Sequence, residues 1–392
     1  VNVSTGTLRL NNSYGGSSAH TGTFNAASGS TLQFNGGTQT ITSTGSVSGA
    51  GSLLVSVGTF NFNGSYSLTG DITVSGGTAN FTPLTGAMSP PSLTISNGTA
   101  NFNVAVSTPT LNFTGGTLNG IAGANTDNLI WSGGTLLGNL TLNSLGTGTL
   151  SGSYTKFIGD GTTAGTFANL GTITDNSTGY ALYLRADSLF DNQGSYTLTT
   201  DAYFETNAAT AAINNGGTFT KNGGAGVSYI NPTFTNTGTV NVSTGTLRLN
   251  NSYGGSSNQT GAFNVASGST LQFNGGTHDF NSGSNVNLAG SLVILGGTVN
   301  FNSGSDVTGN GNIGVGGGIT NVNGGFSLAS TGTVTLTGGT TSFNVPLTFA
   351  NTFTVSSSPY QLLAGPGNLV MSGAFNWRDG AEIGGSGTLT TN

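Results

Sequence analysis

The residues of this chain that are best suited to chemistry gather in one stretch, the acid-rich and tyrosine-rich segment 154–230. Its carboxylates include Asp175, Asp187, Asp191, Asp201 and Glu205. Glycoside hydrolysis would require two carboxylates about 5–10 Å apart. Asp191 and Asp201 would reach that distance only through the geometry of the fold. We therefore assign no catalytic residue. We interpret the segment as a more polar, hydrated face that contacts neighbouring molecules.

Tyrosines in the same segment suggest a binding surface. Tyr180, Tyr183 and Tyr203 are the candidates for contact with a glycan or another cell-surface polymer. Arg185 is the nearest basic residue. Polysaccharide lyases and hydrolases built on a β-helix combine carboxylates with a basic residue and flanking aromatic rings, so an enzyme of that class is a less favoured alternative.

The two histidines do not predict a metal site. When two similar stretches of the chain are aligned, His20 matches Gln259 and His278 matches Gln39. A set of metal ligands should not vary so freely between copies of one repeat, so we expect both histidines to be solvent-facing polar residues. Asp160 lies in IGDGT, an incomplete version of a calcium-binding repeat, and we expect it to occupy a turn. No cofactor is expected.

Composition excludes several partner classes. Only 5% of the 392 residues are charged, and lysine and arginine together number six. Nucleic-acid binding depends on many basic contacts with phosphates, so we exclude a nucleic-acid partner. The chain has no cysteine, and no run of about 18 apolar residues predicts a membrane span. Hydrophobic residues still reach 34%, which is enough for a narrow core and argues against disorder.

A long repeat organises the chain. Residues 1–38 return at 240–277 with four substitutions. In the second copy Asn258, Gln259, Ala262 and Val265 replace Ala19, His20, Thr23 and Ala26. We therefore divide the chain into a first repeat unit, 1–239, and a partial second copy, 240–392, within one rod. Without an initiator Met, it resembles a segment of a longer array, and we expect residues 1–20 to stack on another copy or on preceding sequence.

A shorter period lies inside the long one and predicts the fold. The second Gly of a Gly-Gly-Thr motif recurs at 276, 297, 318 and 339, and a looser series begins at Gly37 and Gly58. Between these glycines lie short segments that alternate apolar and polar residues, as half-buried strands do. The pattern predicts an all-β chain, a parallel β-helix (β-solenoid) with about 19 turns of about 18–23 residues.

A second motif predicts ladders of stacked side chains. It reads FANLGTI at 167–173, FDNQGSY at 190–196, INNGGTF at 213–219 and FTNTGTV at 234–240. Its matched positions are Asn169, Asn192, Asn215 and Asn236 and, on the apolar side, Phe167, Phe190, Ile213 and Phe234. Identical side chains on successive turns can stack inside the coil. Alternatively, these asparagines serve only as left-handed turn residues.

Several runs resemble a known class of proteins. GGTVNF, TGTVNVSTGTLRLNNS, SGSTLQFNGG and SGAFNWRDGAEIGGSGTLT are similar to the repetitive stalks of large bacterial surface proteins. These are the autotransporter passengers, the filamentous-haemagglutinin-like adhesins and giant β-strand-repeat exoproteins. The resemblance implies a right-handed parallel β-helix that is exported and serves as a stalk, adhesin or matrix fibre.

Together these observations predict an extracellular or cell-surface structural protein without enzymatic activity. We expect a stiff rod within a filament, sheath or fibre, with other copies of itself as partners, end-to-end or side by side. An adhesin stalk that binds glycan is the main alternative.

Overall fold

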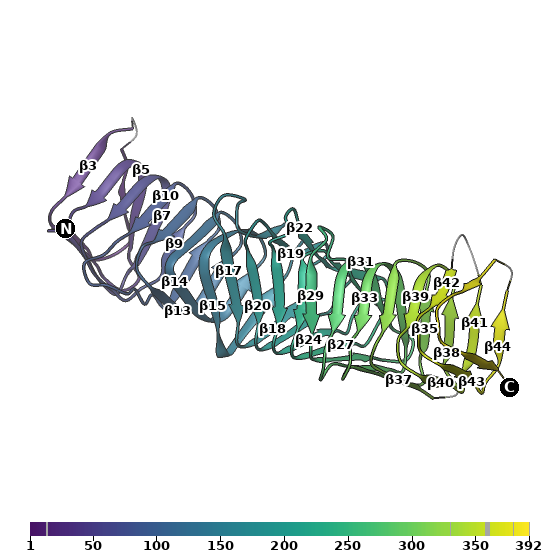
Figure 1. The fold of residues 1–392 in the computed structure, drawn as a ribbon. Coiled ribbons are helices and arrows are strands. Elements are labelled where there is room, and N and C mark those ends of the chain that lie inside the picture. Colours follow the sequence, from purple (N-terminus) through teal and green to yellow (C-terminus); the bar gives the residue numbers. More distant parts are fainter. Residues whose placement is uncertain (13–14, 330, 357–360, 379, 392) are drawn as a thin grey trace. The chain divides into compact units, whose positions relative to one another are not determined.

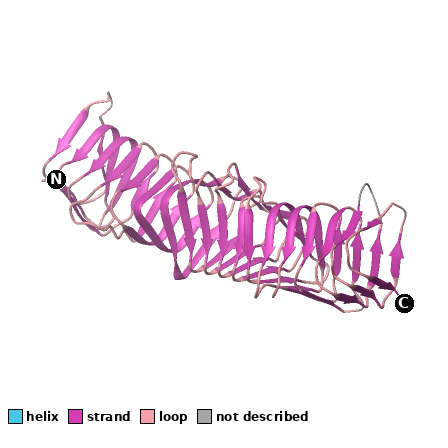
Figure 2. Ribbon diagram, viewed as in Figure 1, coloured by secondary structure: helices cyan, strands magenta, loops and turns pink. Residues whose placement is uncertain are grey.

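Parallel strands form the whole fold. A computed structural model describes residues 1–12, 15–329, 331–356, 361–378 and 380–391. No helix occurs within these ranges (Figure 2). The strands stack as a β-solenoid of about 18 turns, which confirms the predicted fold class. The chain divides into two compact units, Val1–Gly194 and Ser195–Asn392, whose boundary does not coincide with the start of the second sequence copy.

In the first unit, strands stack turn upon turn in register (Figure 1). One series of paired strands is β5 (Thr31–Ile41), β7 (Ser52–Phe62), β10 (Thr78–Phe81), β12 (Thr99–Phe102) and β14 (Thr117–Trp131). One motif position pairs from strand to strand at Thr38, Thr59, Thr78 and Thr99. Each turn therefore repeats the side chains of its neighbour at the same place, about 4.8 Å away.

The Gly-Gly-Thr motif has a simple structural cause. Its second glycine has positive φ at every recurrence, for example 58° at Gly37, 82° at Gly58 and 66° at Gly77. A Cβ atom at Gly77 would overlap the carbonyl oxygen of Gly58 on the preceding turn. Only glycine meets both the left-handed backbone and the close approach, and this is why one glycine marks each turn.

The core is a set of continuous apolar columns inside the coil. In the first unit, Leu32, Leu53 and Ile72 pair in sequence on successive turns and are buried. Phe81 and Phe102 stack with their ring centroids 4.7 Å apart. The alternating pattern read from the sequence thus places its apolar residues inward, as predicted.

The second unit is built in the same way. Its sequence copy supplies β28 (Thr246–Leu249), β31 (Thr270–Phe280), β33 (Ser291–Phe301) and β35 (Asn312–Val315). A buried column runs through Leu247, Leu271, Leu292 and Ile313. The inward apolar positions of the two units therefore follow one rule.

Several turns of segment 154–230 match the predicted length, for example the offset of 23 residues between Phe167 and Phe190. Other turns depart from it, and Ala124 pairs with Leu140 at an offset of only 16. Gly138 pairs with Gly165, an offset of 27 residues, and Phe204 pairs with Ile230, an offset of 26. The range of 18–23 is exceeded because these turns carry extra loop residues. One such loop is closed by Asp160, whose carboxylate accepts hydrogen bonds from the backbone of Thr162 and Thr163 at 2.8 and 2.7 Å.

Candidate functional site

The predicted asparagine positions lie inside the coil as hydrogen-bonded pairs. Asn169 Nδ2 donates to Asn192 Oδ1 at 2.6 Å in the first unit. Asn215 Nδ2 donates to Asn236 Oδ1 at 2.8 Å in the second. All four side chains are buried. A buried amide without partners would cost about 1–3 kcal/mol, so each stacked amide satisfies its neighbour.

The alternative role for these asparagines is wrong. Among the non-glycine residues that the structure describes, only Asp187 and Asn251 have positive φ. The four motif asparagines are therefore strand residues of β17 (Gly165–Asn169), β20 (Leu189–Asn192), β23 (Ala212–Asn215) and β26 (Thr233–Asn236), and do not serve as left-handed turn residues.

The apolar motif positions lie beside the amides. The rings of Phe167 and Phe190 stack with centroids 5.3 Å apart and planes 17° apart. Ile213 pairs in register with Phe234. All four are fully buried. The motif thus packs an aromatic or aliphatic side chain and an amide side by side on each turn.

The tyrosines lie on the outward side of their strands and are half-buried. Tyr180 and Tyr183 belong to β19 (Tyr180–Leu184) in the first unit, with ring centroids 5.9 Å apart. In the second unit, Tyr203 of β22 (Tyr203–Thr206) stacks on Tyr229 of β25 (Val227–Ile230) at 4.5 Å. Each unit therefore contains a pair of neighbouring tyrosine rings.

Arg185 extends the first of these pairs. Its guanidinium carbon lies 4.2 Å from the ring centroid of Phe157, and Nη1 donates to the Asp160 carbonyl at 2.9 Å. A cation over an aromatic face is stabilised by the ring quadrupole. Arg185 is thus engaged with a ring and a carbonyl.

Several carboxylates of the segment have local partners. Asp191 accepts from Gln193 Nε2 at 2.7 Å, and Glu205 accepts from Asn231 Nδ2 at 2.6 Å. Asp175 is fully buried and accepts from the backbone N–H of Ser177 at 2.8 Å. These bonds hold the acids to their own or an adjacent turn.

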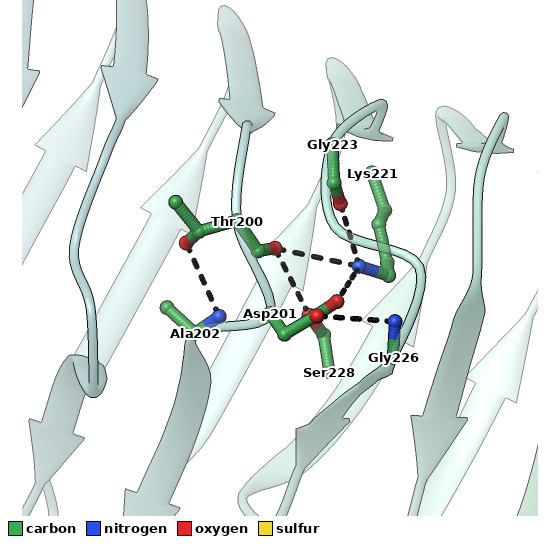
Figure 3. A network of polar contacts seen from close by, with 7 residues as sticks. All are labelled: Thr200, Asp201, Ala202, Lys221, Gly223, Gly226 and Ser228. Carbon is green, nitrogen blue, oxygen red and sulfur yellow. Dashed lines mark hydrogen bonds and ion pairs between the residues drawn. The ribbon is translucent and has the colours of Figure 1, made fainter.

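Both lysines of the chain are buried, which was not predicted from the sequence. Lys221 Nζ lies 2.8 Å from Asp201 Oδ1 and donates to the carbonyls of Thr200 and Gly223 at 3.3 and 2.8 Å (Figure 3). The Asp201 side chain is 41% exposed and also accepts from the Gly226 N–H at 3.0 Å. The network ties the loop at 200–201 to the loop at 223–226.

Lys156 is held in a comparable way in the first unit. Its Nζ donates to the carbonyls of Ser151 and Tyr180 at 3.0 and 3.4 Å. Burial lowers the pKa of Lys156, and the charge of Asp175 acts in the opposite direction. Strand alternation is the signal that could have found both lysines, because Lys221 has the same parity as the buried Phe219 in its strand.

The expectation for the histidines is wrong at His278. That side chain is fully buried, with Nδ1 at 3.1 Å from Ser257 Oγ and Nε2 at 3.0 Å from the Gly275 carbonyl. Burial lowers its pKa to about 4. In the first copy His20 Nε2 contacts Gln39 Oε1 at 2.8 Å, so histidine and glutamine have exchanged places between the copies.

The expected turn at Asp160 is confirmed. Hydrogen bonds from Thr163 and Thr162 lower the pKa of this carboxyl. Among the described residues, no group of three or more His, Asp or Glu side chains could hold a metal ion. No helix within the described ranges is long and apolar enough to cross a membrane.

Comparison with known proteins adds no identity. No protein-family model, curated protein or solved structure matches this chain. The class defined here is that of a parallel β-solenoid with buried amide pairs.

Proposed function

We propose that this chain is an extracellular structural protein whose solenoid forms part of a filament, sheath or cell-surface fibre. The supporting observation is the regularity of the outward face. In the first unit, Asn80 Nδ2 donates to Asn61 Oδ1 at 2.8 Å and Asn101 Nδ2 donates to Asn80 Oδ1 at 2.7 Å. In the second, Asn321 Nδ2 donates to Asn300 Oδ1 at 2.7 Å. These outward polar side chains therefore form hydrogen bonds between successive turns.

The mechanism is mechanical. Successive turns share backbone hydrogen bonds and buried apolar columns, and several also share outward amide bonds. Bending the coil would strain all three sets at once, so we expect stiffness. With 5% charged residues and a net charge of −6, copies repel each other weakly, which favours lateral or end-to-end association. The resemblance to bacterial surface stalks supports the same role.

An adhesin is the second candidate, and one observation favours it. The stacked pair Tyr203–Tyr229 is half-buried and outward-facing, and aromatic faces of this kind suit contact with sugars. Binding on a glycan array that is lost in Tyr203→Ala and Tyr183→Ala, with an unchanged melting temperature, would favour this candidate. Hydrolase or lyase activity lost on Asp191→Ala would instead support an enzyme.

Electron microscopy and fibre diffraction of the native material test the structural role. We expect uniform filaments with a strong reflection near 4.8 Å along the filament axis, the spacing of stacked strands. A dispersed monomer in the native material would contradict the proposal. A matched pair of variants sharpens the test. Thr78→Lys places a charge on the outward face of β10, whereas Leu84→Lys places it at an exposed turn residue. Lateral bundles should separate with the first and persist with the second.

A further inference from the structure

A shallow groove crosses the outside of five successive turns in the second unit. It follows β24 (Thr218–Lys221), β27 (Thr239–Val242), β30 (Ala262–Val265), β32 (Asn285–Leu288) and β34 (Asp306–Gly309). These strands pair in register, so each contributes the same position to the groove. The groove therefore runs across the strands, along the direction in which the turns stack.

One wall of the groove is a ladder of side-chain amides. Asn241 Nδ2 donates to Thr220 Oγ1 at 3.3 Å, and Asn264 Nδ2 donates to Asn241 Oδ1 at 2.9 Å. Asn287 Nδ2 donates to Asn264 Oδ1 at 2.8 Å, and Thr308 Oγ1 donates to Asn287 Oδ1 at 3.2 Å. A primary amide has two N–H donors and two acceptor lone pairs. The ladder uses about half of them, which leaves a donor and an acceptor on each of the three asparagines for a ligand.

The other wall is made of small residues. Ser243, Ala266 and Ala289 follow the strands at matched positions, line the groove and are exposed. Their short side chains leave room beside the amide ladder and present methyl groups to it. A ligand lying there would meet polar atoms on one side and apolar surface on the other.

The lining carries no charge. None of the residues around the groove is a lysine, arginine, histidine or carboxylate. The whole chain has a net charge of −6, which disfavours an acidic polymer. The chemistry of the groove therefore selects an uncharged ligand with a repeating set of hydrogen-bonding groups.

We propose that this groove binds a linear, uncharged polysaccharide along the stacking direction. Sugar hydroxyls both donate and accept hydrogen bonds, so they match an amide ladder that offers both, and the C–H faces of the rings match the Ala266 and Ala289 methyls. A repeating polymer can use every turn of a repeating wall. The site adds a binding activity to the proposed structural role and does not depend on filament formation.

Titration of the full chain with oligosaccharides tests this site. The probes are cellohexaose, xylohexaose, mannohexaose and laminarihexaose, with hexagalacturonate as the acidic comparison, each followed by calorimetry. We expect saturable binding of at least one neutral probe and a loss of at least about tenfold in Ala266→Trp and Ala289→Trp, which fill the groove. Asn264→Leu replaces the amide with an apolar side chain of similar size and should weaken binding by a similar factor.

The first sequence copy supplies matched controls. Ala27→Trp and Asn25→Leu change the equivalent residues of 1–38, where the column continues with Ser48, whose Oγ donates to Asn25 Oδ1 at 3.5 Å. These variants should bind as the parent chain does. The proposal is overturned if no neutral probe binds, if only hexagalacturonate binds, or if Ala266→Trp and Ala27→Trp have the same effect. Filaments that persist in Ala266→Trp would separate this site from the structural role.

Discussion

The two copies of the 38-residue segment, 1–38 and 240–277, show how one sequence acquires two environments. Both contain the strand TLRL, β2 (Thr7–Leu10) and β28 (Thr246–Leu249). Leu247 and Leu249 are fully buried, whereas Leu8 and Leu10 are half-buried. β28 lies between β25 and β31 and pairs with both.

The matching glycines of the two copies also differ in how closely a preceding turn packs against them. Gly245 and Gly6 have φ values of 60° and 68°. A Cβ on Gly245 would lie 2.5 Å from the Gly226 carbonyl oxygen, whereas a Cβ on Gly6 would have nothing within 4 Å. The preceding turn thus supplies the close packing, and the local sequence supplies only the backbone conformation. A turn of this fold is stabilised mainly by its neighbours.

The largest expected effect comes from truncating the shared leucine. Leu247→Ala should destabilise its turn by about 2–5 kcal/mol, because it leaves a cavity in a turn that has a neighbouring turn on each side. In a chain that spans residues 1–392, Leu8→Ala should cost about 1 kcal/mol, because its side chain is partly in solvent there. Native-state hydrogen exchange at the affected turn measures both. Equal losses of stability in the two variants would contradict the difference in burial between Leu247 and Leu8.

The burial of His278, which takes the place of Gln39 in the second copy, predicts that stability depends on pH. His278 has a folded pKa of about 4, and in the unfolded chain the ordinary value is about 6.5. The unfolded state therefore binds more protons between these values, so stability is complete above about pH 6.5 and falls by about 3 kcal/mol as the pH drops through 4.

Replacing His278 tests whether stability falls at low pH and whether this histidine is the cause. His278→Gln introduces the residue that the first copy buries at the matching position, Gln39. It should remove most of the loss between pH 6.5 and 4, as measured by thermal unfolding across this range. If the variant keeps the slope of the parent chain, burial of His278 is not its cause.

A smaller effect is expected from alanine at the paired glycines. Both substitutions force a left-handed backbone on a residue with a Cβ, at about 1–2 kcal/mol. Gly245→Ala adds a contact with the Gly226 carbonyl oxygen, for a further loss of about 1–3 kcal/mol. Urea denaturation of the two variants gives the difference. A Gly6→Ala chain that is as unstable as Gly245→Ala would show that the preceding turn is unimportant.

The smallest effect concerns the outward amides. Asn264 bonds to both neighbouring turns at 2.9 and 2.8 Å, whereas Asn25 receives one bond of 3.5 Å. Asn264→Ala should cost about 1–2 kcal/mol and Asn25→Ala less than about 0.5 kcal/mol. Thermal unfolding of the two variants resolves this difference, and reversal of their order would contradict the ladder.

The sequence predicted the fold because its signals are local and repeat on every turn. Gly58 and Gly77 mark the stacking period, and the alternation around Phe81 and Phe102 places the core. The burial of Lys221 was not predicted, because its partners include Asp201, twenty residues earlier on the preceding turn.

Other features that depend on contacts between turns were equally hidden. His278 reads as a polar residue until its contact with Ser257, 21 residues earlier, is known. The groove beside Asn264 depends on five turns in register, and no single turn contains it. Contacts between turns decide these features, and offsets that vary from 16 to 27 residues conceal them in the sequence.

Amide hydrogen exchange at the two TLRL strands, in a chain that spans residues 1–392, tests most directly whether neighbouring turns supply the stability. Because the four residues are identical, their intrinsic exchange rates are nearly the same. We expect the amides of β28 to exchange at least about tenfold more slowly than those of β2. Equal protection of the two strands would show that the local sequence, and not the stacking of turns, stabilises this solenoid.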